Sequence, residues 1–147
     1  MNIIFICHGN ICRSPVGEIL LKKLVQENGL EDKIYVLSRA TSLEEIGNDI
    51  YQPMKRVLLI HNISFDRHYA TRITTKEFEE ADYIFYMDSN NLYYLRRMFG
   101  DSPKFHLISE YDDGFEVEDP WYTGRFELVF SLIKRYVETI YKKVANE

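Results

Sequence analysis

A chain of 147 residues is long enough to bury a complete hydrophobic core, and we expect one domain, residues 1–147. The net charge of −5, from 23 acidic and 18 basic side chains, disfavours nucleic acid as a partner, because nucleic-acid binding usually needs a basic face. The apolar segment 3–6 is too short, and lacks the basic flank, for a signal peptide or membrane span. These features predict a cytoplasmic protein with no membrane contact, and we expect a monomer or weak dimer.

The first half of the chain alternates between strand and helix patterns. Residues 3–6 are all apolar, which predicts a central parallel strand covered on both faces. A helix with Pro15 at its first position is expected to end near residues 28–29. Residues 34–37 are predicted as the second strand, 38–52 as a polar loop, and 53–61 as the second helix.

The second half continues the alternation. A short helix through Phe78 is expected, with Thr74 or Thr75 as its cap, followed by a third strand at 83–87. The remaining predicted elements are a helix over 88–100, a fourth strand at 105–108, a long acidic loop over 109–123, and an amphipathic helix over 126–144.

Four short strands interleaved with helices predict a three-layer α/β/α fold with an open parallel sheet and right-handed crossovers. Open sheets of this kind bind ligands at the carboxyl ends of their strands. Residue 7 lies at the end of the first predicted strand, so a site is expected there.

The segment Cys7-His8-Gly9-Asn10-Ile11-Cys12-Arg13-Ser14-Pro15 has the residues that a phosphate-binding loop needs. Cys7 is the candidate nucleophile, since backbone N–H groups, a helix N-terminus and a nearby arginine all favour a thiolate. Arg13 carries a planar, permanently charged fork that matches two phosphate oxygens. The same groups that favour the thiolate also favour a bound oxyanion.

Three other residues of the loop have expected structural roles. Gly9 allows a tight turn and a close approach to a ligand, and Asn10 is suited to bracing the loop from inside. Ser14 is expected either to cap the following helix or to donate its hydroxyl to the Cys7 sulfur.

A simpler interpretation makes Cys7 and Cys12 small buried hydrophobes. It is disfavoured because an arginine in a first helical turn opposes the helix dipole unless an anion is present.

This nine-residue segment resembles the phosphate-binding loop of the low-molecular-weight protein tyrosine phosphatases, and the similarity extends along most of the chain. It implies a flavodoxin-like or Rossmann-like sheet of order 2-1-3-4 and one phosphatase domain. It also implies that His8, Gly9, Asn10, Ile11, Cys12 and Ser14 bind substrate together with Cys7 and Arg13. In relatives the residue at the Cys12 position forms a reversible disulfide with the nucleophile, while a small packed residue is the alternative here.

The resemblance also identifies a general acid. Asp119-Pro120 resembles the Asp-Pro pair that carries the acid in this family, with Glu116 and Glu118 as solvated neighbours. Trp121 and Tyr122 follow as the aromatic wall of the pocket. Asp88 matches a family aspartate that orders the site, although capping the next helix explains it equally well.

These roles imply hydrolysis of phosphotyrosine through a cysteinyl-phosphate, with Asp119 as acid and then base and with no metal or cofactor. The expected partner is a phosphotyrosine-containing protein. A partner tyrosine kinase acting on Tyr122 is left open. The four histidines lack metal-ligand spacing, so His61 and His106 are interpreted as structural, and His68 as a support for the site.

The sequence departs from the family where Glu44 and Glu45 stand in place of an aromatic wall residue, which predicts discrimination against acidic flanking sequences. His8 replaces a common aliphatic residue, and its imidazole is expected to make the environment of the Cys7 thiolate sensitive to pH. Three alternatives remain. An arsenate reductase needs additional cysteines, an arginine phosphatase tends to carry threonine where Ile11 stands, and a binding or redox module needs no acid.

Overall fold

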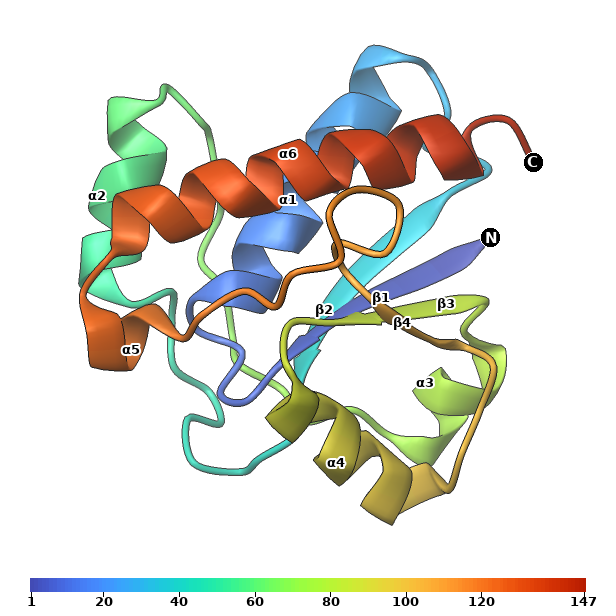
Figure 1. Ribbon diagram of the computed structural model, residues 1–147. Coiled ribbons are helices and arrows are strands. Elements are labelled where there is room, and N and C mark those ends of the chain that lie inside the picture. Colours follow the sequence, from blue (N-terminus) through green and yellow to red (C-terminus); the bar gives the residue numbers. More distant parts are fainter.

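The computed structural model describes residues 1–147. A four-stranded parallel sheet of order β2-β1-β3-β4 lies between two layers of helices (Figure 1). The strands are β1 (Asn2–Cys7), β2 (Tyr35–Ala40), β3 (Tyr83–Tyr86) and β4 (Phe105–Leu107). The helices are α1 (Arg13–Glu27), α2 (Gln52–Ile60), α3 (Thr75–Glu80), α4 (Ser89–Phe99), α5 (Pro120–Thr123) and α6 (Phe126–Val144). The expected three-layer fold and strand order are confirmed.

The apolar residues of β1 divide between two cores, which explains why the strand is apolar throughout. Ile3 and Phe5 pack into the larger core, which includes residues of α1, α2 and α6. Ile4 and Ile6 point to the other face and pack into the smaller core beside Leu95 of α4. Burial on both faces makes β1 the fixed centre of the sheet.

The parallel strands bring their carboxyl ends to one edge. Cys7 of β1 aligns with Ala40 of β2, and Ile6 aligns with Tyr86 of β3. The segments that leave this edge are therefore neighbours although they are far apart in the sequence. Figure 1 shows the loop after β1, the segment after β2, the start of α4 and α5 gathered at this end of the molecule.

The helix predicted over residues 126–144 is confirmed as α6. Its buried face includes Val129, Ile133, Val137 and Ile140, and these side chains belong to the larger core. None of the helices combines the length and the apolar character that crossing a bilayer requires.

The second strand was placed wrongly. Residues 34–37 were expected as strand and 38–52 as loop, but β2 continues through Ala40. Ser38 is fully buried, with its hydroxyl bonded to Glu18, and Arg39 pairs with Glu77 of α3. Because both polar side chains bond to residues far away in the sequence, they can lie within a strand, and the strand continues through them.

Two helix boundaries also differ from expectation. α1 begins at Arg13, so Pro15 is the third residue of the helix rather than the first. The predicted loop over 109–123 contains the short helix α5, with Asp119 as its N-cap. Thr74 is confirmed as the cap of α3, in a reciprocal pair of hydrogen bonds with Glu77.

Candidate active site

The loop between β1 and α1 is wound tightly around the Cys7 sulfur. Asn10 has a left-handed backbone with φ of 61°, and its N–H donates to Cys7 Sγ at 3.3 Å. Gly9, expected to allow a tight turn and a close approach to a ligand, has no positive φ. A Cβ there would lie 3.2 Å from Cγ of Glu45, so glycine leaves space for that side chain. Asn10 tolerates the left-handed conformation better than most residues.

A cavity of about 130 Å³ opens over this loop and gathers three segments. The loop and the start of α1 contribute Cys7, His8, Gly9, Ile11, Cys12 and Arg13; the segment after β2 contributes Glu44 and Glu45; and the α5 region contributes Asp119, Trp121 and Tyr122. Asn10 and Ser14, expected among the substrate-binding residues, are fully buried and do not line the cavity.

Arg13 is held in one position by groups from two segments, the start of α4 and the segment before α5. Its side chain is 2% exposed, and Nη1 donates to Asp88 Oδ2 at 2.7 Å and to the Val117 carbonyl at 2.9 Å. Nη2 lies 3.5 Å from Asp119 Oδ2. Burial opposes the charge, but the negative charges of Cys7, Asp88 and Asp119 outweigh it and raise the pKa of the guanidinium. The permanent cation therefore stays fixed beside Cys7.

Asp88 has both of the roles considered for it. It caps α4, with Oδ1 accepting from the Asn91 N–H at 2.9 Å, while its other oxygen holds Arg13. One carboxylate thus ties the guanidinium to the start of a helix.

Asp119 is oriented by its position as the N-cap of α5. Its Oδ1 accepts from the Trp121 N–H at 3.0 Å, which leaves Oδ2 toward Arg13. The preceding residues are anchored as well. The Val117 N–H donates to the Met87 carbonyl at 2.9 Å, and Glu118 pairs with Arg125.

Glu116 is exposed and Glu118 is half-buried, and both carboxylates also have partners within the chain. Glu116 accepts a hydrogen bond from the Ser89 amide, and the hydrogen bond from Arg125 lowers the pKa of Glu118. The two glutamates fix the segment that carries Asp119 against α4 and the start of α6. No local pattern indicates these contacts, because Ser89 is 27 residues from Glu116 and α5 separates Glu118 from Arg125.

The Asn10 side chain sets the direction of the hydrogen bonds behind the sulfur. Its Oδ1 accepts from the Thr71 N–H at 3.0 Å, so its Nδ2 is the donor to Ser14 Oγ at 2.8 Å. With its oxygen already accepting, the Ser14 hydroxyl has its own hydrogen to give to Cys7 Sγ, 3.0 Å away. Of the two roles expected for Ser14, the contact with sulfur is present, and no side chain caps α1.

The same amide connects the loop to α1. Asn10 Nδ2 also donates to Ser38 Oγ at 3.0 Å, and the Ser38 hydroxyl donates to Glu18 Oε1 at 2.6 Å. Ser38 and Glu18 were not identified from the sequence. The only signal was a serine at the end of an otherwise apolar strand pattern.

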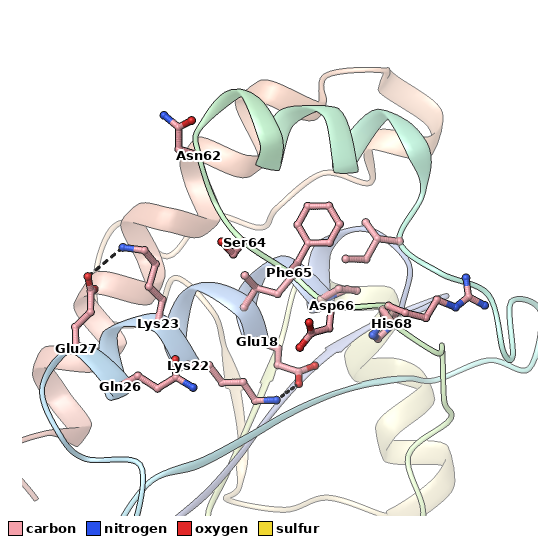
Figure 2. A pocket seen from close by; sticks show the side chains of 14 residues that line it. Glu18, Lys22, Lys23, Gln26, Glu27, Asn62, Ser64, Phe65, Asp66 and His68 are labelled. Atoms are coloured by element: carbon pink, nitrogen blue, oxygen red, sulfur yellow. Dashed lines mark hydrogen bonds and ion pairs between the residues drawn. The ribbon is translucent and has the colours of Figure 1, made fainter.

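The outer end of this chain of hydrogen bonds lies at a polar groove of about 690 Å³ beside α1. Figure 2 shows Glu18 on this groove, paired with Lys22 of the same helix, and His68 farther along it. The Nε2 atom of His68 lies 2.6 Å from the Asn10 carbonyl oxygen. His68 therefore contacts the loop from behind, in the position of a support.

We predict that Ser14→Ala slows the alkylation of Cys7 by iodoacetamide at neutral pH by about tenfold, because a hydrogen bond to a charged group is lost. Peptide mapping after timed labelling gives the rate at Cys7. Ser131→Ala, at an exposed position of α6, is the matched control. An unchanged rate in Ser14→Ala would contradict the assigned direction of the hydrogen bond.

Cys12 lines the same cavity but differs from Cys7 in its surroundings. It is 5% exposed, and burial together with the nearby charge of Cys7 raises the pKa of its thiol far above the ordinary value. Cys12 therefore stays protonated and is a poor nucleophile. Both cysteines are free thiols in this structure, and the disulfide implied by the family resemblance stays a prediction.

The mouth of the cavity carries acidic and aromatic groups. His8 Nε2 lies 3.0 Å from Glu44 Oε2, and Glu45 accepts from the Asn48 amide at 2.6 Å. Trp121 is 51% exposed and packs on Tyr51, with ring centroids 4.7 Å apart. Tyr51 was missed in the sequence because it lies at the start of α2, 70 residues before the Trp121 ring that it contacts.

The remaining histidines contact residues outside the cavity. His61 stacks on Phe130, with ring centroids 4.4 Å apart, and contacts Glu127. His106 Nδ1 lies 2.8 Å from Glu110 Oε2. No group of three or more His, Cys, Asp or Glu side chains is arranged to hold a metal ion.

The family model described as "Low molecular weight phosphotyrosine protein phosphatase" matches residues 2–147. The chain is 35% identical over 152 residues to the low molecular weight protein-tyrosine-phosphatase YfkJ of Bacillus subtilis, covering 100% of this chain and 97% of that protein. It is 34% identical to the human low molecular weight phosphotyrosine protein phosphatase, with 97% and 94% covered.

Solved structures agree with these matches. The crystal structure of YfkJ from Bacillus subtilis superposes with a TM-score of 0.94 over 99% of this chain and 95% of that one. A structure of the YwlE arginine phosphatase superposes with a TM-score of 0.88 over 100% and 97% of the two chains; at 23% identity it shares the fold. The full-length matches to the family model and to relatives at about a third identity establish that this chain belongs to the low-molecular-weight phosphotyrosine protein phosphatase family.

Proposed function

We propose that this phosphatase hydrolyses phosphotyrosine and other aryl phosphate monoesters through a cysteinyl-phosphate on Cys7. The proposal rests on one juxtaposition. A cysteine held by hydrogen-bond donors, a buried arginine and a carboxylic acid 3.5 Å from that arginine face the same small cavity. Nucleophile, phosphate clamp and proton donor are the three groups that the reaction needs.

In the first step the Cys7 thiolate attacks phosphorus in line, so that an S–P bond forms while the P–O bond to the aryl group breaks. Arg13 and the amides of the loop and the α1 N-terminus hold the equatorial oxygens in the loose transition state. Asp119 gives its proton to the departing phenolate oxygen. A bound phosphate dianion replaces the Asp119 carboxylate as the partner of Arg13, which favours the protonated acid.

In the second step water cleaves the cysteinyl-phosphate. Asp119, now ionised, takes a proton from the water as its oxygen bonds to phosphorus and the S–P bond breaks. The electron pair of that bond returns to sulfur, where the Ser14 hydroxyl donates to it. Inorganic phosphate then leaves a regenerated thiolate.

The residues at the cavity favour phosphotyrosine over the alternatives. Ile11 and Trp121 provide an apolar surface against which an aryl ring can lie. Both cysteines lie within the loop, so the additional thiols of an arsenate reductase are missing from this chain. A binding module would not need an acid beside Arg13. We infer phosphotyrosine proteins as substrates and, because Cys7 must be a free thiol, a reducing compartment such as the cytoplasm.

The test is hydrolysis of p-nitrophenyl phosphate in EDTA with reduced thiols, for the parent and Cys7→Ser. We expect turnover by the parent and none by the variant. A comparison of phosphotyrosine and phosphoarginine peptides of one sequence separates the two phosphatase activities. Faster release from phosphoarginine would favour the arginine phosphatase, and no turnover of any substrate would favour a binding or redox module.

A second prediction concerns the acidic mouth. The parent should hydrolyse phosphotyrosine peptides with basic flanking residues faster than peptides with acidic ones. Replacing both Glu44 and Glu45 with lysine should shift this preference toward acidic flanking residues. The expected change is about tenfold in the ratio of kcat/KM values, since like charges in such a site repel appreciably. Measurement at low and high salt checks the electrostatic origin. An unchanged ranking would contradict the role of the two glutamates.

A further inference from the structure

A second cavity, of about 530 Å³, lies directly against the proposed active site and shares His8 and Glu44 with it. Its other walls come from residues 41–43 after β2, from Arg72 and from Tyr94 of α4. The His8 and Tyr94 rings lie with their centroids 6.2 Å apart and their planes tilted by 52°. A substrate bound over Cys7 therefore has a hollow beside it, separated only by the His8–Glu44 pair.

The walls of this side cavity combine apolar surface with a fixed guanidinium. Leu43 is 65% exposed and Tyr94 is 43% exposed, so both present apolar area that nothing in the chain covers. Arg72 Nε donates to the Thr41 carbonyl at 3.2 Å, and Nη2 donates to Met98 Sδ at 3.3 Å. Because these bonds lie in the guanidinium plane, they fix the group and leave its faces without hydrogen bonds.

This set of surfaces suits an aromatic ring better than a charged group. Leucine and tyrosine side chains contribute apolar contact, and a guanidinium face and a tyrosine ring both attract an aromatic ring. A carboxylate, in contrast, would lie near Glu44, which the cavity shares with the active site. An aliphatic side chain would gain the apolar contact but not the interactions of the ring.

We propose that the side cavity binds an aromatic side chain of the substrate within two residues of the phosphotyrosine. Residues rise about 3.3 Å each in an extended peptide, and side chains two apart lie on one face, so a neighbouring side chain can reach a cavity that adjoins the active site. The inference rests on the proposed phosphotyrosine phosphatase activity and assigns a preferred substrate class to it.

The experiment uses phosphotyrosine peptides that carry phenylalanine or alanine at each of the four positions nearest the phosphotyrosine. We expect the parent to hydrolyse the phenylalanine peptide about fivefold faster in kcat/KM at one position or more. Tyr94→Ala and Leu43→Ala should lower that preference below about twofold, and Tyr94→Phe should retain it. Turnover of p-nitrophenyl phosphate, which is too small to reach the side cavity, should stay within about twofold of the parent in every variant.

Matched controls come from exposed residues away from both cavities. Tyr35→Ala at the far end of β2 and Leu59→Ala on α2 remove side chains of the same types that are 55% and 64% exposed. Equal hydrolysis of all peptides by the parent, or a preference that persists in Tyr94→Ala, would overturn the side-cavity proposal while leaving the phosphatase activity intact. A parent that hydrolyses neither the peptides nor p-nitrophenyl phosphate would instead refute the proposed function itself.

Discussion

Replacing Arg13 with lysine is expected to lower kcat/KM for p-nitrophenyl phosphate by about 10³-fold. Lysine keeps the charge but presents it as a single point, whereas the guanidinium can bind two phosphate oxygens at once. The substitution also disturbs the hydrogen bonds from Nη1 to Asp88 and to the Val117 carbonyl. Loss of the bond to the Val117 carbonyl also removes one of the anchors of the segment that carries Asp119.

Steady-state kinetics with thermal unfolding of the same samples separates this effect from misfolding. We expect a stability loss of about 2 kcal/mol at most, because Asp88 keeps a cation nearby and its side chain is 22% exposed. Arg135→Lys, at a surface arginine that pairs with Asp112 and Asp113, should leave kcat/KM within about twofold of the parent. If a folded Arg13→Lys protein loses less than tenfold in kcat/KM, the two-point binding of phosphate by the guanidinium is not needed.

Asp119→Asn should lower kcat/KM by about 10³-fold for phenyl phosphate and by a smaller factor for p-nitrophenyl phosphate. The amide cannot give a proton to the leaving oxygen, and phenolate needs that proton much more than the stabilised nitrophenolate does. Asparagine retains an oxygen to accept from the Trp121 N–H, so the start of α5 is preserved.

The dependence on the leaving group is the informative readout for Asp119. A plot of log kcat/KM against the acidity of the phenol should be steeper for the variant than for the parent, because kcat/KM reports the step in which the phenol leaves. Asp101→Asn, at an 82% exposed aspartate paired with Arg96, serves as the control for removal of a carboxylate. Equal slopes in parent and Asp119→Asn would exclude Asp119 as the proton donor.

Much of the fold follows from patterns that are local in the sequence. The apolar segments 3–6 and 83–87, and the regular spacing of Val129, Ile133 and Val137, indicate buried strands and an amphipathic helix without further context. Alternation of these elements leads to the three-layer architecture. The sheet order 2-1-3-4 was implied by the family resemblance, and the structure confirms it.

The parts that were missed depend on contacts between distant residues. β2 continues through Ser38 because Asn10 and Glu18 satisfy a serine hydroxyl that, read alone, indicates a loop. The left-handed angle lies at Asn10 rather than Gly9, where the Asn10 N–H donates to Cys7 Sγ and the Asn10 side chain accepts from the Thr71 N–H. No local pattern specifies such contacts.

For the candidate site, the loop motif and the Asp-Pro pair located the groups now found around one cavity. Their supports could not be located in the same way. A helix cap explains Asp88 equally well from the sequence. The sequence also does not indicate that Glu116 and Glu118 contact Ser89 and Arg125. These roles follow only from the tertiary structure, because the partners of the three carboxylates lie in different elements, namely α1, α4 and the start of α6.

The covalent step is tested most directly by trapping the phosphoryl group on the enzyme. Asp119→Asn should form the intermediate from p-nitrophenyl phosphate and hydrolyse it slowly, so a rapid denaturing quench and mass spectrometry can capture it. We expect the mass of one phosphoryl group on the peptide that contains Cys7, and no such mass on the corresponding peptide of a Cys7→Ala, Asp119→Asn double variant. A phosphoryl group on another residue, or parental turnover by Cys7→Ala alone, would contradict a cysteinyl-phosphate mechanism.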